Sequence, residues 1–159
     1  MSNQFILLNI FQIILLFYDI FANFFVDTLA TRNVDLLVMH ILQDLCLIFS
    51  ALIINILLFN TFVFKRGYVK LLLKEMTSTI VNFFIYFLLC ISLHTWDFIS
   101  RWQTPLALPD NEGYFFLTGL QKCFSVIHYY YFSRSFLILG QRKYNENSAW
   151  LEKYISQQN

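Results

Sequence analysis

Long apolar runs alternate with short polar stretches along the whole chain. The runs are continuous, without the in-and-out alternation of a β-strand, and each reaches the roughly 20 residues that a transmembrane helix needs. They cover residues 5–29, 36–64, 79–99 and 114–139. No proline falls inside them, so each run is expected to form an unkinked helix. The pattern predicts an all-α membrane protein, a four-span transmembrane helical bundle with short loops.

A short amphipathic tail is expected to follow the bundle. Residues 1–143 form the predicted four-helix transmembrane domain, and residues 144–159 form the cytoplasmic tail. A short helix there would place four apolar side chains on one face: Trp150, Leu151, Tyr154 and Ile155. Such a face suits docking on a membrane or a partner protein. The alternative is a frayed tail in which this pattern is incidental.

The stretch between the second and third runs is also amphipathic. Lys70 and Lys74 are interleaved there with four apolar residues: Tyr68, Leu71, Leu72 and Met76. This spacing is typical of a helical turn that lies in the membrane interface. We therefore expect residues 68–76 to be separate from the third span.

Composition places most of the chain in lipid. Apolar residues make up 58% of the 159 residues and charged residues 13%, whereas soluble domains have about 45–50% and about 25%. The balance excludes a soluble globular domain, and it excludes intrinsic disorder, which needs low hydrophobicity and high charge. A net charge of +1 does not form the basic surface that nucleic acid needs. The expected surroundings are therefore the lipid bilayer, and no nucleic acid partner is expected.

The basic residues predict the orientation. Eight of the eleven lysines and arginines fall in the loop after the second run and in the C-terminal part: Lys65, Arg66, Lys70, Lys74, Arg134, Arg142, Lys143 and Lys153. Arg32 and Arg101 fall on the other side. Cytoplasmic loops carry the excess of basic residues. Four spans then place both termini in the cytoplasm.

Ionisable and amide side chains inside the runs are expected to face one another. Such residues are costly in lipid and usually lie in the bundle interior. Asp19 and Asn23 are four residues apart and share one helix face. Asp44 and Lys122 each lie eight residues from the same side of the membrane, about 12 Å deep at 1.5 Å per residue. An ion pair between them is geometrically feasible, and His94 lies near the same side.

The intramembrane polar cluster is therefore predicted to comprise Asp19, Asn23, Asp44, His94 and Lys122. Our main interpretation is structural: these side chains hold the helices in register. One alternative is a small channel or transporter, or its auxiliary subunit, that uses Asp19, Asp44 and Lys122. Another is a partner subunit that neutralises one of the charges.

No residue pattern indicates an enzyme or a cofactor. The serines inside the runs lack the surroundings of a nucleophile elbow, and the three cysteines have neither disulfide nor zinc spacing. The nearest approach to a metal site is the set of His40, His94 and Asp97. A catalytic zinc site needs three protein ligands that are held in place by second-shell hydrogen bonds, and the sequence shows no motif for one. We therefore predict no catalytic, cofactor-binding or metal-binding residues.

The order of several short motifs resembles that of the transmembrane protein 138 family. These motifs are Tyr18-Asp19 with Asn23, Gln43-Asp44-Leu45, Asn60-Thr61-Phe62-Val63-Phe64, Ser92-Leu93-His94-Thr95-Trp96, Gly140 and Trp150-Leu151. The likeness runs over about residues 15–155 at compatible spacing. The loop 97–113 and the stretch 141–147 depart most from the family pattern.

The resemblance implies a non-enzymatic protein that helps to build or maintain cilia. It implies a multi-pass protein of the ciliary membrane or transition zone and of vesicle or vacuole membranes. Its role would be that of a scaffold or trafficking subunit that works with other ciliary membrane proteins, in a hetero-oligomeric complex. The family supplies no catalytic or ligand-binding residues to transfer to this sequence.

Overall fold

The regular structure that the chain forms is helical throughout its described part. The computed structural model describes residues 3–30, 32–65, 69–102 and 111–141. Its helices are α1 (Asn3–Leu29), α2 (Asn33–Asn60), α3 (Phe62–Lys65), α4 (Val69–Arg101) and α5 (Glu112–Leu139). The predicted all-α class is confirmed for these ranges. The predicted tail helix, with Trp150, Leu151, Tyr154 and Ile155, lies outside the described residues.

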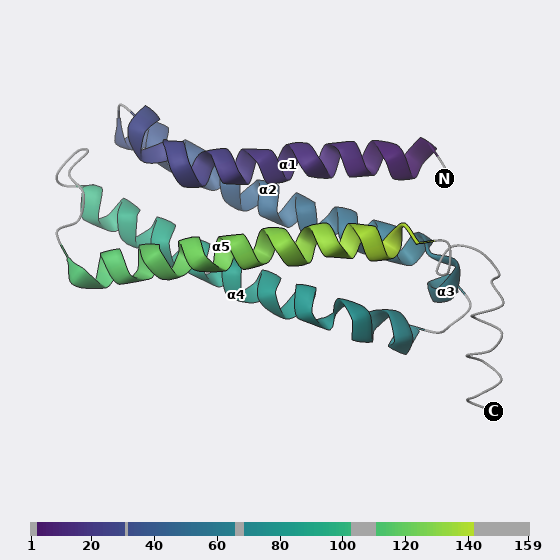
Figure 1. The fold of residues 1–159 in the computed structure, drawn as a ribbon. Coiled ribbons are helices and arrows are strands. Elements are labelled where there is room, and N and C mark those ends of the chain that lie inside the picture. Colours follow the sequence, from purple (N-terminus) through teal and green to yellow (C-terminus); the bar gives the residue numbers. More distant parts are fainter. Residues whose placement is uncertain (1–2, 31, 66–68, 103–110, 142–159) are drawn as a thin grey trace.

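The four long helices run side by side (Figure 1). α1 lies against α2, α2 against α4, and α4 against α5. The α1–α2 turn lies at one end of the molecule, which we call the turn end. The end of α4, before the 103–110 segment, and the start of α5, after it, lie at the same end. The start of α1, the short α3 and the end of α5 lie at the opposite end, which we call the terminal end.

Each long helix buries one stripe of residues spaced alternately by three and four. In α2 the stripe contains Leu36, Gln43, Leu47, Ser50, Ile54 and Leu57. In α5 it contains Tyr114, Gln121, Ser125, His128, Phe132, Ser135 and Leu139. A repeat of 3.5 residues is the spacing that packs helices at about 20° to one another, with side chains interdigitating. The bundle is therefore specified by the positions of its buried residues as well as by their hydrophobicity.

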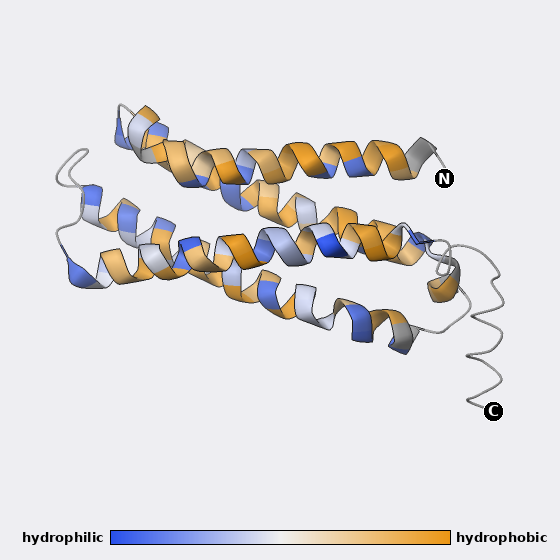
Figure 2. Cartoon of the chain, in the orientation of Figure 1, coloured by the Kyte–Doolittle hydropathy of each residue, from blue (hydrophilic) through white to orange (hydrophobic). Residues whose placement is uncertain are grey.

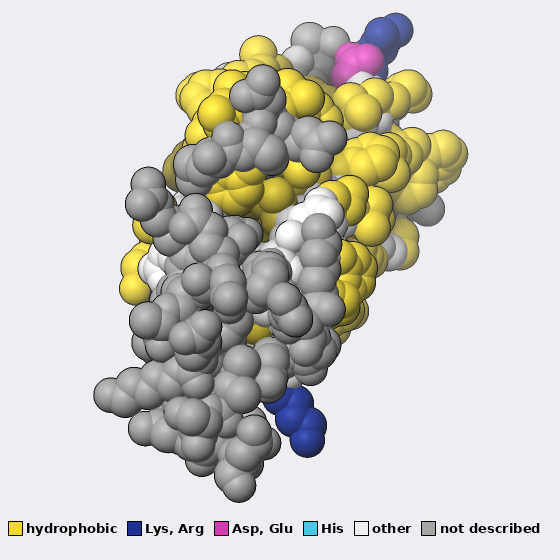
Figure 3. Space-filling view, turned by 90° about the vertical axis from the view of Figure 1, so that its right-hand side faces the viewer, with side chains coloured by type: hydrophobic (Ala, Val, Ile, Leu, Met, Phe, Trp, Pro, Cys, Tyr) yellow, Lys and Arg dark blue, Asp and Glu magenta, His cyan; other side chains and the backbone are white. Residues whose placement is uncertain are grey.

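The polarity of the bundle is the reverse of that in a soluble protein. Buried stripes carry amides and hydroxyls such as those of Gln43, Ser50 and Gln121, whereas Phe17, Phe24 and many other large apolar side chains are exposed. Hydrophobic residues dominate the helix surfaces (Figure 2) and cover the sides that are visible from the terminal end (Figure 3). An apolar surface around a partly polar interior fits a lipid environment, in which apolar side chains gain nothing by burial.

Three helices are long and apolar enough to cross a membrane. Their apolar segments are Phe5–Val26 in α1, Asn33–Asn60 in α2 and Leu72–Arg101 in α4. These segments correspond to the first three predicted spans. The fourth predicted span, residues 114–139, is a helix, α5.

The α2 helix ends earlier than predicted. We expected it to continue to residue 64, but Thr61 has an extended backbone with φ −66° and ψ 145°. Its hydroxyl donates to the Leu58 carbonyl at 2.7 Å and accepts from the Phe64 amide at 3.3 Å. These two bonds satisfy backbone groups that the break leaves open, at the end of α2 and the start of α3.

The predicted separate turn at residues 68–76 is wrong for the described part of this stretch, because residues 69–76 belong to the long helix α4. Leu72 and Met76 are completely or almost completely buried, at 0% and 1% exposure, in the core at the terminal end. They continue the buried stripe that reaches Thr79 in steps of three and four. The lysines among them are compatible with one continuous helix because Lys70 and Lys74 lie on its exposed side.

Candidate functional site

A buried carboxylate joins three neighbouring helices near the middle of the bundle. Asp19 of α1 is 1% exposed and accepts hydrogen bonds at both oxygens. Gln43 Nε2 of α2 donates to Oδ1 at 2.8 Å. The hydroxyls of Tyr86 on α4 and Tyr129 on α5 each donate to Oδ2 at 2.9 Å. Three donors compensate for the loss of water around the carboxylate, which would otherwise be costly to bury.

Asn23 extends this arrangement by one turn of α1. Its amide nitrogen donates to the hydroxyls of Tyr86 at 2.8 Å and Tyr129 at 2.7 Å. Its amide oxygen accepts from Gln121 Nε2 at 2.7 Å and Gln43 Nε2 at 3.1 Å. We call Asp19, Asn23, Gln43, Tyr86, Gln121 and Tyr129 the Asp19 network. It connects all four long helices through side chains alone.

A small polar cavity adjoins the Asp19 network on the side of the turn end. Its volume is about 40 Å³, and its lining includes Asn23, Gln43, His94, Asp97 and Gln121. A space of this size with several polar groups suits one or two water molecules. The cavity is therefore a place for bound water between the network and the polar groups nearer the turn end.

Asp44 pairs with a histidine. Its carboxylate oxygens lie 3.1 and 3.2 Å from Nδ1 of His94, which therefore carries the proton and donates. The His40 ring stacks on the His94 ring with centroids 4.1 Å apart and planes 9° apart. These residues connect α2 to α4, in addition to the contact that Gln43 and Tyr86 make through Asp19.

A buried ion pair closes the turn end of the bundle. Arg101 Nε donates to Asp97 Oδ1 at 2.7 Å, and both residues are buried. The Tyr114 hydroxyl of α5 donates to the same oxygen at 3.1 Å. Asn33 Nδ2, at the start of α2, donates to the Arg101 carbonyl at 2.6 Å. Three helices therefore meet at this pair.

Lys122 lines the small polar cavity together with Asn23, His94 and Asp97, but it forms no ion pair with a carboxylate of the described residues. It is exposed on α5, and its ammonium lies 5.9 Å from the centroid of the Phe24 ring. The ion pair that we considered between Asp44 and Lys122 is not formed. The reason is rotational: Gln121 and Ser125 face the interior, and the next residue along a helix points about 100° away.

The structure therefore divides the predicted polar cluster into three parts. Asp19 and Asn23 belong to one network, Asp44 and His94 form a separate pair, and Lys122 faces outward. Asp19 is enclosed by donors, whereas Lys122 is exposed. The three charges named in the channel alternative do not share one cavity.

Several residues that make buried polar contacts lie outside the predicted polar cluster. They are Gln43, Tyr86 and Gln121, together with the Asp97–Arg101 pair and its partner Tyr114. We gave priority to charged residues, whereas Gln43 and Gln121 occupy the 3–4 stripes that also carry buried leucines and phenylalanines. The stripe was the available signal, because a polar residue on a buried stripe must find a partner.

The chemistry of these side chains is that of hydrogen-bonded contact between helices. The tyrosine hydroxyls and the amides of the network are engaged with one another or with Asp19. Within the described ranges, no three His, Cys, Asp or Glu side chains are placed to hold a metal ion. Cys46, Cys90 and Cys123 are free thiols.

Known proteins resemble the chain over most of its length. A family model described as Transmembrane protein 138 matches residues 36–154. Transmembrane protein 138 of Xenopus tropicalis is 37% identical over 142 residues, which are 89% of this chain and 88% of that protein. The Mus musculus protein of that name is 36% identical over 92% of this chain and 90% of its own length, and the Danio rerio protein is 33% identical over 94% and 93%. No solved structure matches the chain.

Proposed function

The chain belongs to the transmembrane protein 138 family, and from this premise we propose that it is a non-enzymatic membrane protein required to assemble or maintain cilia. In this role it acts as a scaffold or trafficking subunit for other membrane proteins at the cilium or transition zone. The ciliary role is what membership of this family implies. Vesicle or vacuole membranes are its second proposed location.

The use of the buried polar groups supports a scaffold. Asp19 and Asn23 bind donors from α2, α4 and α5, and Asp97 binds Arg101 and Tyr114. Groups engaged in this way fix the relative positions of four helices. A rigid bundle with an apolar surface presents fixed helix faces to other membrane-spanning proteins, which is what a scaffold needs.

We also propose that α5 is the fourth span and that both termini face the cytoplasm. The 28 residues of α5 are as many as those of α2, and α5 lies alongside α4, which is apolar enough to span. Eight of the eleven basic residues lie on one side in this arrangement, as the positive-inside rule requires. Among the described long helices, α5 is the one that is not apolar enough to count as a span by length and composition alone.

The proposed function is tested by depletion and rescue in ciliated cells. Depletion is expected to reduce the number or length of cilia, or the amount of membrane proteins inside them, and the wild-type chain is expected to restore these values. An Asn55→Leu chain is expected to rescue as well as the wild-type chain, because Asn55 is exposed and donates to the carbonyl of Ala51 in its own helix. Cilia of normal number, length and membrane-protein content after complete depletion would contradict the proposal.

A further inference from the structure

The exposed side of α5 differs from those of α1 and α2, which expose mainly phenylalanine, leucine and isoleucine. α5 exposes a stripe made of Gly119, Cys123, Val126, Tyr130, Ser133 and Leu137. Three of these residues are small: Gly119, Cys123 and Ser133. Figure 2 shows the contrast, since α1 is almost uniformly hydrophobic and α5 is mixed. α5 is also not among the three helices whose apolar segments suffice to span a membrane.

The spacing of this exposed stripe is that of a helix-packing surface. Its members follow one another in steps of four, three, four, three and four residues, the 3.5-residue repeat by which helices interdigitate. Small residues in membrane helices let a second helix approach closely. At Gly119 an added Cβ would meet nothing within 4 Å, so the helix surface there is open to a neighbouring helix.

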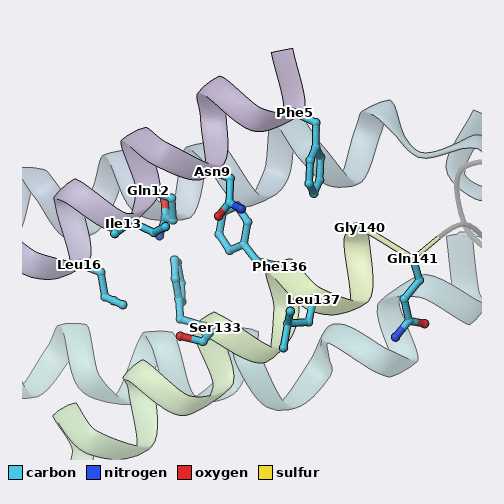
Figure 4. A pocket seen from close by; sticks show the side chains of 11 residues that line it. Phe5, Asn9, Gln12, Ile13, Leu16, Ser133, Phe136, Leu137, Gly140 and Gln141 are labelled. Atoms are coloured by element: carbon cyan, nitrogen blue, oxygen red, sulfur yellow. The ribbon is translucent and has the colours of Figure 1, made fainter. Parts of the chain in front are cut away.

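The stripe continues into a groove between α5 and α1. A groove of about 450 Å³ lies between the two helices near the terminal end. Ser133 and Leu137 of the stripe line it from α5, and Asn9, Ile13 and Leu16 line it from α1 (Figure 4). The groove and the stripe thus form one elongated surface, which we call the α1/α5 surface.

Lys122 supplies the charge on this surface. It lies ten residues after the start of α5 at Glu112, about 15 Å along the helix, and it is exposed beside Gly119 and Cys123. A charge at this depth in a span is costly and usually pairs with an opposite charge. Its ammonium lies 5.9 Å from the centroid of the Phe24 ring. Lys122 also lines the small polar cavity that Asp97 lines, but no carboxylate of the described residues forms an ion pair with it.

We infer that the α1/α5 surface binds one membrane-spanning helix of a partner protein, which carries an aspartate or glutamate at the depth of Lys122. The inference rests on the proposed scaffold role and names the site and the partner for it. Charge complementarity selects this occupant. A lipid acyl chain offers no counter-charge at this depth. A second copy of the chain, related by a two-fold axis through the stripe, would place Lys122 near Lys122.

The test is photo-crosslinking of the full-length chain in ciliated cells. A photo-activatable residue is placed at Val126 or Ser133, and for comparison at Leu88, which is 63% exposed on α4. Mass spectrometry of the adducts is expected to identify at Val126 and Ser133 a membrane-spanning segment that contains Asp or Glu. Leu88 is expected to yield lipid adducts. Lys122→Leu should lower the protein adducts about tenfold or more, the factor by which a modest loss of binding free energy reduces occupancy.

Three results would overturn the inference. They are adducts at both stripe positions with phospholipid alone, adducts with another copy of this chain, and protein adducts whose yield is unchanged by Lys122→Leu. A charge exchange provides the second variant: Lys122→Glu should lose the adduct, and lysine at the identified acidic position of the partner should restore it. Because Lys122 is exposed, equal amounts of membrane-inserted protein are expected for all variants.

The site and the function can fail separately. If depletion removes cilia but the stripe contacts only lipid, the scaffold proposal holds and its partner binds elsewhere. If the stripe binds the acidic helix but depletion leaves cilia intact, the docking site holds and the ciliary role fails. Measuring both in one cell line distinguishes these outcomes.

Discussion

Asp19 is the residue on which the interior depends most. Its two carboxylate oxygens accept three hydrogen bonds from three different helices. Removing an acceptor leaves its donors buried without partners, and the cost of such unpaired donors usually exceeds the value of the bond itself. The effect of a substitution at Asp19 should therefore depend on whether the new side chain can still accept.

Asp19→Leu should lower the free energy of unfolding by at least about 2 kcal/mol more than Asp19→Asn, because asparagine keeps an acceptor for the tyrosine hydroxyls. Thermal unfolding in a mild detergent would measure both. Asn55→Leu removes a polar group from the exposed surface and should change stability by less than about 0.5 kcal/mol. Equal losses for the two Asp19 variants would show that its hydrogen bonds contribute little.

The pairing of Asp44 gives a second prediction. Asp44→Leu and His94→Leu should be non-additive, with a coupling free energy of about 0.5–3 kcal/mol, because the two side chains are in contact. Asp44→Leu and Lys122→Leu should add to within about 0.5 kcal/mol, since no ion pair joins those residues. The same unfolding assay in detergent measures both coupling free energies. Coupling of Asp44 to Lys122, and not to His94, would contradict the structure.

Sequence reasoning at this scale succeeded for the type of residue and failed for the partners. Depth along the helix is readable from the sequence, so Asp44 and Lys122 were placed at similar depth. The rotation of each side chain depends on which stripe packs inward, and in an apolar helix hydrophobicity alone does not mark that stripe. Lys122 lies one residue after the buried Gln121 and therefore points away.

Among the elements, the junction between α2 and α3 depends on one hydroxyl. Thr61 is buried and bonds to both flanking helices through Oγ1. Thr61→Val should lower the free energy of unfolding by about 1 kcal/mol, as expected for loss of a helix cap. Thr61→Ser keeps the hydroxyl and is the matched control. If Thr61→Ser lowered the free energy of unfolding as much as Thr61→Val, the hydroxyl, which serine keeps, would not be what stabilises the junction.

The helices could be predicted because a run of about 20 apolar residues has few other stable structures in a membrane. The ends of α1 at Leu29 and α5 at Leu139 were predicted as well, whereas the end of α2 and the start of α4 were not. Lys70 and Lys74 indicated a separate interfacial turn, yet the buried stripe continues through Leu72 and Met76 to Thr79. At the other junction a threonine, which is common inside membrane helices, separates α2 from α3. Local composition does not specify whether such residues end a helix, because packing against neighbouring helices decides it.

For the whole molecule, the main prediction concerns orientation. Epitope tags placed before Ser2 and after Asn159 should both be accessible to antibody only after selective permeabilisation of the plasma membrane. The physical reason is the concentration of basic residues between residues 65 and 74 and in the C-terminal part. A tag inserted in the 103–110 segment is the control and should label on intact cells that display the protein. Labelling of either terminus on intact cells would refute the orientation.

Because the Asp19 network spans four helices, its members are synthesised at different times. Asp19 enters the membrane with the first helix, whereas its donor Tyr129 lies 110 residues later. At 5–20 residues per second, roughly 5–20 s of synthesis separate the two. During this interval Gln43 is synthesised first and Tyr86 later, so the carboxylate lacks its full set of donors until Tyr129 is made. The insertion machinery must therefore shelter the α1–α2 hairpin until translation delivers α5, and a ribosome that stalls before Tyr129 leaves a nascent chain whose aspartate has no complete set of partners.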